Sequence, residues 1–168
     1  MVGKKASTDG SVMTAHCCDS YYRTFVTIEP RKTFALLIAG SRTYSDYAEF
    51  SRITDRMLSL VQDKYEILII EGEASGTDSM ARRYAQEHKY RLAPFPADWD
   101  TYGRSAGYLR NEQMADELTL YSKSAALYFW DGESRGTKHC IGEVKKRGIP
   151  YKVFNFRNGQ FMKVGDKT

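Results

Sequence analysis

The chain has 168 residues, 42% of them hydrophobic, which suits one domain with a buried core and is short for two. The formal net charge of +4 is mild, and the basic residues are dispersed apart from Lys145-Lys146-Arg147, so we expect a small anionic ligand rather than DNA. No apolar run approaches the roughly 18 residues of a membrane span, and the three cysteines lack Cys-x-x-Cys spacing. These features predict a cytoplasmic protein.

Residues 1–20 are small, polar and without periodicity, and we interpret them as a flexible leader. His16-Cys17-Cys18 within it is a poor metal motif, because adjacent cysteines do not easily occupy two tetrahedral positions. Residues 21–32 include a β-branched and aromatic run that stops at Pro30, which predicts an edge strand or an arm against a partner. Residues 33–168 are predicted to form one domain.

The first half of that domain alternates strands and helices. Residues 34–39 form a nearly continuous apolar run, the pattern of a parallel strand buried on both faces. Apolar residues at helical spacing predict a helix over residues 46–62. A second buried strand is predicted at residues 67–70, and a glycine-containing turn leads from it to a helix over residues 79–88.

The alternation continues to the end of the chain. Residues 91–95 predict a short edge strand because two prolines flank its end, and residues 97–107 predict a polar, aromatic loop before a helix over residues 108–118. Residues 125–130 predict the fourth strand, and after a turn containing Gly132 a helix restarts beyond Gly136-Thr137.

Residues 151–156 predict a fifth strand, and the Asn158-Gly159 pair that follows is typical of a type I′ turn. We therefore expect residues 160–164 to fold back as an antiparallel strand.

This order predicts an α/β fold: a Rossmann-like open parallel sheet of about five strands flanked by helices, with a C-terminal antiparallel hairpin. In the strand order three-two-one-four-five, strands one and four are neighbours at the topological switch point, where such sheets bind ligands. The loops at Gly40 and Gly132 would open into one crevice, with the loop at Gly72 beside them. Gly-x-Gly-x-x-Gly and Walker A motifs are absent, which argues against an ordinary dinucleotide dehydrogenase.

Four ordered motifs carry a resemblance to a known family. They are IAGSRTY (38–44), EGEASGTD (71–78), FPADWDTYGRSAGYLRNEQM (95–114) and FWDGESRGTKH (129–139). Together they resemble the SLOG superfamily and, within it, the YspA-like, cpYpsA-related proteins. More distantly, the chain is similar to LOG-type phosphoribohydrolases and to DprA. The resemblance implies a Rossmann-like nucleotide-binding fold.

LOG-type enzymes cleave the base from a nucleoside monophosphate, and they carry Arg-Lys-x-x-Met and Gly-Gly-x-Gly-Thr-x-x-Glu motifs. Arg110 and Met114 match the first motif, and Gly136-Thr137 matches part of the second. Near the position of that family's glutamate, this chain has Lys138, His139 and Cys140, none of which is a carboxylate. The resemblance therefore implies a role for Arg110, but it does not imply the catalytic pair of arginine and glutamate found in LOG-type enzymes.

Glycine turns with hydroxyl side chains present backbone N–H groups at helix N-termini, which is a common way to bind phosphate. The residues expected to bind ligand in this way, with their arginine partners and the asparagine beside Arg110, are Gly40, Ser41, Arg42, Gly72, Gly76, Thr77, Arg110, Asn111, Gly132, Ser134, Arg135, Gly136 and Thr137. For each single turn, the alternative is a plain β-α connection.

Aromatic and acidic residues near these turns are candidates for contacts with a base and a ribose. Trp99, Tyr102 and Trp130 could stack on a base, although Trp130 ends a buried strand and core packing suits it better. Ribose acceptors, or replacements for the missing acid or base, are expected among Asp98, Asp131 and Glu133. Asp78 could contact ligand, but a helix cap is its simpler role.

Three hypotheses follow. The first is a sensor or sequestering protein for a phosphorylated nucleoside or an ADP-ribose-like signal. The alternative is a nucleotide N-glycosidic bond hydrolase that uses Arg110 with one of the three carboxylates. The third is single-stranded DNA binding as in DprA, against which the dispersed charge argues.

No cofactor is required by any of these hypotheses, and Mg²⁺ is expected only with a bound phosphate. We expect a homodimer or larger homo-oligomer and no membrane partner. If a phage encodes the protein, the host cytoplasm is its expected location.

Overall fold

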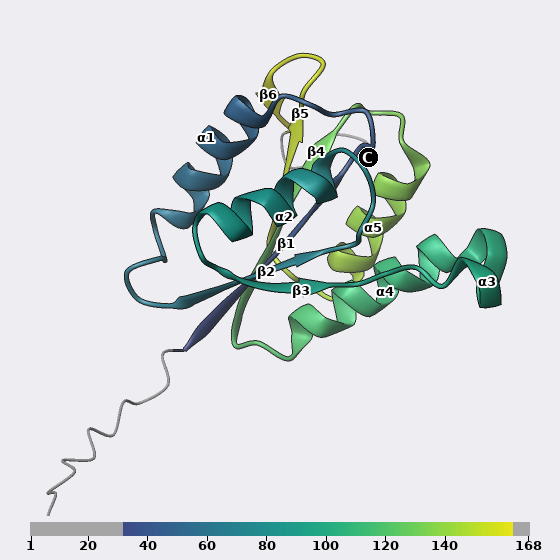
Figure 1. Cartoon of the computed structure of the whole chain (residues 1–168), viewed down its shortest axis with the longest axis horizontal. Coiled ribbons are helices and arrows are strands. Elements are labelled where there is room, and N and C mark those ends of the chain that lie inside the picture. Colours follow the sequence, from purple (N-terminus) through teal and green to yellow (C-terminus); the bar gives the residue numbers. More distant parts are fainter. Residues whose placement is uncertain (1–31, 163–168) are drawn as a thin grey trace, which may run out of the picture.

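Helices cover both faces of a single β-sheet in the computed structural model, which describes residues 32–162 (Figure 1). Within these residues the sheet has six strands in the order β3-β2-β1-β4-β5-β6. Strands β1 to β5 are parallel, and β6 is antiparallel to β5. The α/β class, the strand order and the edge position of β3 are therefore as predicted. The predicted leader and residues 21–31 of the predicted arm lie outside the described residues.

The elements alternate along the chain. They are β1 (Thr33–Gly40), α1 (Tyr47–Leu58), β2 (Glu66–Glu71), α2 (Thr77–Glu87), β3 (Arg91–Pro94), α3 (Trp99–Tyr102), a short 3-10 helix (Gly103–Ser105), α4 (Ala106–Thr119), β4 (Lys123–Trp130), α5 (Arg135–Lys146), β5 (Tyr151–Asn155) and β6 (Gln160–Phe161). None of the helices in this part of the chain has the length and apolar character of a membrane span.

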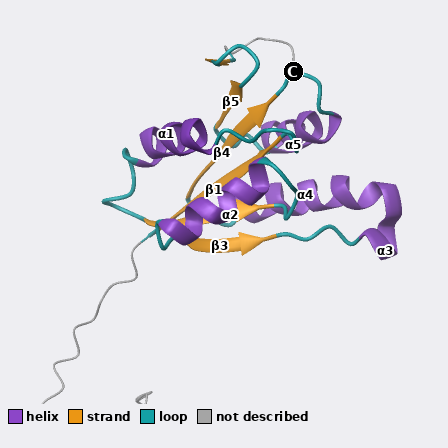
Figure 2. Cartoon of the chain, turned by 45° about the horizontal axis from the view of Figure 1, so that its top comes forward, coloured by secondary structure: helices purple, strands orange, loops and turns teal. Residues whose placement is uncertain are grey.

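The core consists of two layers, one on each side of the sheet. Figure 2 shows the helices that cover the two faces. On one side, Phe50 of α1 and Tyr84 of α2 pack on alternate residues of β1 and β4. On the other side, Met114 of α4 and Ile141 of α5 cover the remaining residues of the same strands. Central strands that are covered on both faces must be apolar at every position. For this reason β1 and β4 can be recognised in the sequence as apolar runs.

Several helix ends differ from the predictions. Asp46 accepts the N–H of Glu49 and starts α1, but α1 ends at Leu58, so Leu60 is 75% exposed rather than packed in the core. The loop predicted at residues 97–107 contains α3 and the 3-10 helix, and α4 begins at Ala106.

The C-terminal hairpin is present, but its turn is not type I′. A type I′ turn needs positive φ at both central residues, and of the Asn158-Gly159 pair only Gly159, at 68°, has it. The backbone N–H of Gly159 donates to the carbonyl of Asn155, which places the pair at the end of a longer loop. Of the predicted strand 160–164, residues 163 and 164 lie outside the described residues.

Gly40 is the point where β1 leaves the sheet between β4 and α2. A Cβ atom at Gly40 would lie 2.2 Å from the carbonyl oxygen of Phe129 and 2.5 Å from Oγ1 of Thr77. The next residue, Ser41, donates its N–H to that same Phe129 carbonyl at 2.9 Å. Glycine is therefore required at this position by close approach of backbone, not by an unusual φ.

We expect Gly40→Ala to lower the free energy of unfolding by at least about 2 kcal/mol, because the clash is with backbone that cannot move aside. Urea denaturation measures this change. The matched control is Gly142→Ala in α5, where an added Cβ meets no heavy atom within 4 Å. That variant should be unchanged or more stable by up to about 1 kcal/mol. If Gly40→Ala were as stable as the wild type, the close packing described between β1, β4 and α2 would be contradicted.

Candidate ligand-binding cavity

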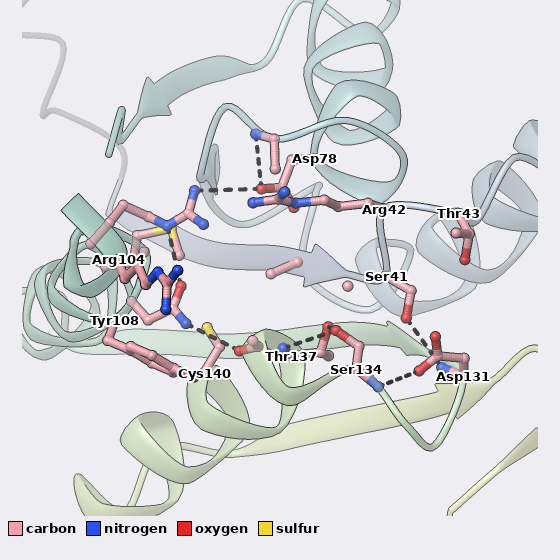
Figure 3. A pocket seen from close by; sticks show the side chains of 18 of the residues that line it. Ser41, Arg42, Thr43, Asp78, Arg104, Tyr108, Asp131, Ser134, Thr137 and Cys140 are labelled. Atoms are coloured by element: carbon pink, nitrogen blue, oxygen red, sulfur yellow. Dashed lines mark hydrogen bonds and ion pairs between the residues drawn. The ribbon is translucent and has the colours of Figure 1, made fainter. Parts of the chain in front are cut away.

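A cavity of about 450 Å³ opens at the carboxyl ends of β1 and β4, the switch point of the sheet (Figure 3). It is the size of a small-molecule site. The residues predicted to bind ligand that line it are Gly40, Ser41, Arg42, Asp78, Trp99, Arg110, Asn111, Asp131, Ser134, Gly136 and Thr137. The loops after β1 and β4 therefore meet in one site, as the strand order requires.

The turn between β4 and α5 is fixed by two of its own side chains. Asp131 Oδ1 accepts the N–H groups of Glu133 at 2.9 Å and Ser134 at 2.8 Å. Burial by itself raises the pKa of Asp131, but these N–H groups outweigh it and lower the pKa below its usual value. Ser134 is the N-cap of α5 and accepts the N–H of Thr137. The backbone N–H groups of Glu133 and Ser134 therefore already donate hydrogen bonds within the turn.

The N–H groups left for a ligand belong to Arg135 and Gly136, in the first turn of α5. The N–H groups of a first helical turn have no partner inside the helix, and no hydrogen bond within residues 32–162 takes up these two. A Cβ at Gly136 would meet nothing within 4 Å, so the space in front of this helix end is open. Because α5 starts at Arg135, Gly136 is inside the helix and not before it, which corrects the predicted start.

Arg110 is held at the wall of the cavity by two neighbours. It is 9% exposed, its Nη1 donates to the carbonyl of Gly72, and its Nε donates to Oδ1 of Asn111 at 3.2 Å. No residue in the described part of the chain takes a hydrogen bond from its Nη2. A buried guanidinium with a free edge on a cavity is suited to bind an anion.

Asp78 lies beside Arg110, and its role differs from the predicted helix cap. The N-cap of α2 is Gly76, with φ of 72°, whereas Asp78 lies within the first turn. Its Oδ2 accepts the N–H of Ala74 at 3.3 Å and lies 3.8 Å from Nη1 of Arg110. Burial raises the pKa of Asp78 to about 6, an effect that the positive charge of Arg110 opposes without cancelling. The cavity therefore contains a carboxyl group that titrates near neutrality.

Asn111 connects this wall to the turn before α5. Its Nδ2 donates to the carbonyl of Gly136 at 3.1 Å and lies 3.4 Å from Nδ1 of His139. The ring of His139 packs edge-on against Tyr108. The Arg110-Asn111 pair thus fixes the position of the α5 N-terminus relative to α4.

The aromatic residues separate into two groups. Trp99 of α3 lines the cavity and is 51% exposed, so its ring is available to a ligand. Tyr102, on the same short helix, is also exposed but does not line the cavity. Trp130 is 3% exposed, lies in the core and donates its Nε1 hydrogen to the carbonyl of Ser134. This position agrees with the expectation that Trp130 packs in the core.

Other predicted residues lie around the cavity without lining it. Gly72 borders Arg110 and a neighbouring cavity, and Gly76, Gly132 and Arg135 occupy loop or helix-end positions. Glu133 is directed away and pairs with Arg157 at 2.6 Å. Asp98 caps α3 by accepting the N–H of Thr101. Neither Glu133 nor Asp98 is positioned to replace the glutamate of the LOG motif.

The position of that glutamate, three residues beyond Thr137, is occupied by Cys140. The thiol lines the cavity, and burial raises its pKa to about 12. The hydroxyl of Tyr128 donates to its sulfur. A protonated, buried thiol cannot stabilise a cationic sugar as a carboxylate does.

Sequence reasoning missed several lining residues, among them Thr43, Ala74, Arg104, Gly107, Tyr108 and Met114. The spacing of Gly107, Arg110, Asn111 and Met114 along one helical face was a signal that could have identified part of this wall.

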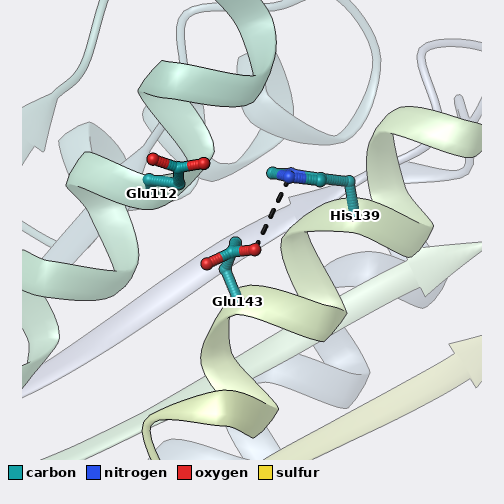
Figure 4. Close-up of side chains that lie close together, drawn as sticks. All are labelled: Glu112, His139 and Glu143. Atoms are coloured by element: carbon teal, nitrogen blue, oxygen red, sulfur yellow. Dashed lines mark ion pairs between the residues drawn. The ribbon is translucent and has the colours of Figure 1, made fainter.

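A group of possible metal ligands lies between α4 and α5, beside the cavity: Glu112, His139 and Glu143 (Figure 4). Glu143 already pairs with Lys146 at 2.6 Å and Arg147 at 2.8 Å, which lower its pKa. Nδ1 of His139 lies 3.4 Å from Nδ2 of Asn111, and its Nε2 lies 3.5 Å from Oε1 of Glu143. These contacts describe an ion-pair network that holds the two helices together.

Comparison with known proteins gives two matches. Residues 34–102 match the model of the YspA, cpYpsA-related SLOG family. The chain is also 34% identical, over 127 residues, to the Gene 61 protein of Mycobacterium phage D29, with 72% of this chain and 94% of that protein covered. The matched family segment contains the loops after β1 and β2 and ends at α3.

The raised pKa of Asp78 predicts a pH-dependent stability. The folded carboxyl, with a pKa of about 6, holds its proton more tightly than the unfolded one near 3.8, so the stabilisation is complete at low pH and is lost as the pH rises through 6. Relative to Asp78→Asn, the wild type should lose up to about 3 kcal/mol of unfolding free energy between pH 3 and pH 7.

Urea denaturation across this pH range measures the difference. Asp63→Asn, an exposed site, should follow the wild type at every pH. A constant difference between the wild type and Asp78→Asn would show that Asp78 does not titrate as described.

Proposed function

The chain belongs to the YspA, cpYpsA-related SLOG family, and on that premise we propose that its switch-point cavity binds a phosphorylated nucleoside derivative. The protein would act as a sensor of this ligand or would sequester it. The observation that carries the proposal is the convergence of the open α5 N-terminus at Gly136 and the free edge of Arg110 on one cavity.

The phosphate is assigned to the first turn of α5. The two N–H groups at the start of α5 have no partner among the described residues, the space at Gly136 is open, and the positive end of the helix dipole favours an anion there. The hydroxyl of Thr137 and the guanidinium of Arg110 border the same volume. The turn needs no rearrangement to accept a phosphate, because Asp131 and Ser134 already fix it.

The base is assigned to the mouth of the cavity. Trp99 offers an exposed ring there, and Tyr108, 42% exposed, lies on the same wall. Base-aromatic stacking tolerates any base, so these rings support binding without naming the nucleotide. Ribose hydroxyls would find acceptors between these two ends, of which Asp78 is the buried one.

Binding without turnover is favoured by the residue at position 140. Where LOG-type enzymes have a glutamate, this cavity has a thiol whose pKa is about 12. The relationship to a mycobacteriophage protein fits a setting in which the ligand is a nucleotide of the infected host. A homo-oligomeric state stays a prediction.

One observation favours a second candidate, hydrolysis of an N-glycosidic bond. Asp78 and Asp131 line the same cavity, and the pKa of the first is raised to about 6 while that of the second is lowered. Such a separation is typical of acid-base pairs. In that reaction water replaces the base at C1′: protonated Asp78 gives its proton to the leaving nitrogen and regains one from the attacking water.

We expect Gly136→Asp to reduce nucleotide affinity by at least about 100-fold, because its carboxylate would occupy the phosphate position and repel the anion. An acidic residue in a first helical turn is favourable, so the fold should be retained. Titration calorimetry with AMP and ADP-ribose measures the affinity, and circular dichroism verifies the fold. Gly142→Asp carries the same charge further along α5, outside the cavity lining, and should bind within about threefold of wild type. Equal affinities for the wild type and Gly136→Asp would refute the phosphate assignment.

The two candidate functions differ in what is recovered after incubation with nucleotide. For a sensor or sequestering protein, native mass spectrometry followed by denaturation should return the nucleotide intact and in stoichiometric amount. For a hydrolase, free base and ribose phosphate should accumulate and should be lost in Asp78→Asn. Accumulation that is unchanged in Asp78→Asn would exclude Asp78 as the acid.

A further inference from the structure

We propose that the ligand has two ends: a nucleoside phosphate in the cavity at β1 and β4, joined through a second phosphate to a polar, sugar-like group in an adjoining cavity at β2 and β3. The proposal rests on the nucleotide-binding function proposed above and narrows its ligand to pyrophosphate-linked compounds.

The adjoining cavity has a volume of about 400 Å³ and is bordered by the loops that follow β2 and β3. Gly72, Glu73 and Ser75 come from the first loop, and Pro96 and Ala97 from the second. Since β3, β2, β1 and β4 are consecutive in the sheet, their loops follow one another along one edge. The two cavities are therefore neighbours along that edge.

Four residues line both cavities: Arg42, Ala74, Trp99 and Arg110. A ligand that extended from one cavity into the other would lie against these residues. Two of them are cationic, and Arg110 keeps its Nη2 free of hydrogen bonds to described residues. Two guanidinium groups at a passage fit a linker with more than one negative charge, and a pyrophosphate meets this condition.

One residue that lines the second cavity, Glu73, is held in a strained backbone conformation by a buried carboxylate. Glu73 has φ of 57°, which is unusual for a residue other than glycine. Its N–H donates to Oε2 of Glu71, which is fully buried and pairs with Arg82 at 2.9 Å. Strain of this kind persists where surrounding contacts enforce it, and it is found disproportionately at ligand sites.

The chemistry of the second cavity suits hydroxyl groups better than a base. Polar residues such as Glu73 and Ser75 line it, and the one aromatic side chain among the residues that line it, Trp99, lies at the passage. Glu73 pairs with Arg82 at 3.1 Å, so its carboxylate is held in place at the rim. A polyhydroxylated group can exchange hydrogen bonds with such a surface without requiring an apolar slot.

The test compares AMP, ADP and ADP-ribose as probes of one phosphate, two phosphates and two phosphates with a second sugar. By titration calorimetry, wild-type protein should bind ADP-ribose at least about tenfold more tightly than AMP, with ADP between them. Ala97→Trp fills the second cavity, and Ala97 does not line the first. This variant should bind ADP-ribose no more tightly than ADP, while its AMP affinity stays within about twofold of wild type.

Ala48→Trp, on the exposed surface of α1, is the matched control and should bind all three probes as wild type does. Ser75→Trp fills the same cavity from the other loop and replaces Ala97→Trp if that variant does not fold. Equal wild-type affinity for AMP and ADP-ribose, or equal losses for both in the filled variants, would overturn the two-ended ligand and leave nucleotide binding intact. Failure of all three probes to bind the wild type would instead overturn the proposed function itself.

Discussion

The hydrogen bonds of Ser41 connect the three loops from which the cavity is built. Its N–H donates to the carbonyl of Phe129, its carbonyl accepts the hydroxyl of Thr77 at 3.1 Å, and its Oγ accepts the N–H of Asp131 at 3.3 Å. Ser41 is 1% exposed, so each bond is made where water cannot replace it. The loops after β1, β2 and β4 are thereby fixed relative to one another, and the turn before α5 and the start of α2, which carries Asp78, acquire their positions from this connection. Gly40 permits it, because any side chain there would separate β1 from β4.

Much of this fold follows from the sequence, for a physical reason. Strands buried on both faces must be apolar at every position, so β1, β2 and β4 are visible as short continuous runs. Short β-α alternation then restricts the topology, and the strand order was predicted correctly. The ends of helices and strands were harder to predict from the sequence. They depend on single hydrogen bonds, such as that of Ser134 with Thr137, and Gly136 in the first turn of α5 suggested a loop because glycine is a poor helix former.

The candidate site was predictable to the extent that the backbone alone determines it. The loops that contain Gly40 and Gly132 were expected to open into one crevice, and residues of both line the cavity because parallel strands place these loops at one edge. The directions of individual side chains were not predictable. Glu133 turns outward because Arg157, far along the chain, binds it. Spacing along a sequence contains no information on such a distant partner.

Asp78 illustrates the same limit and also suggests how the cavity tolerates a buried cation. A guanidinium as enclosed as that of Arg110 is costly without a compensating negative charge. Asp78 supplies that charge at 3.8 Å, yet burial holds its pKa near 6, so it becomes neutral at small cost. A phosphate that reached Arg110 would provide the negative charge itself and would favour protonated Asp78, since two anions beside one cation repel each other. The pair can therefore exchange an internal anion for an external one without leaving Arg110 unpaired, which suits reversible capture of an anionic ligand.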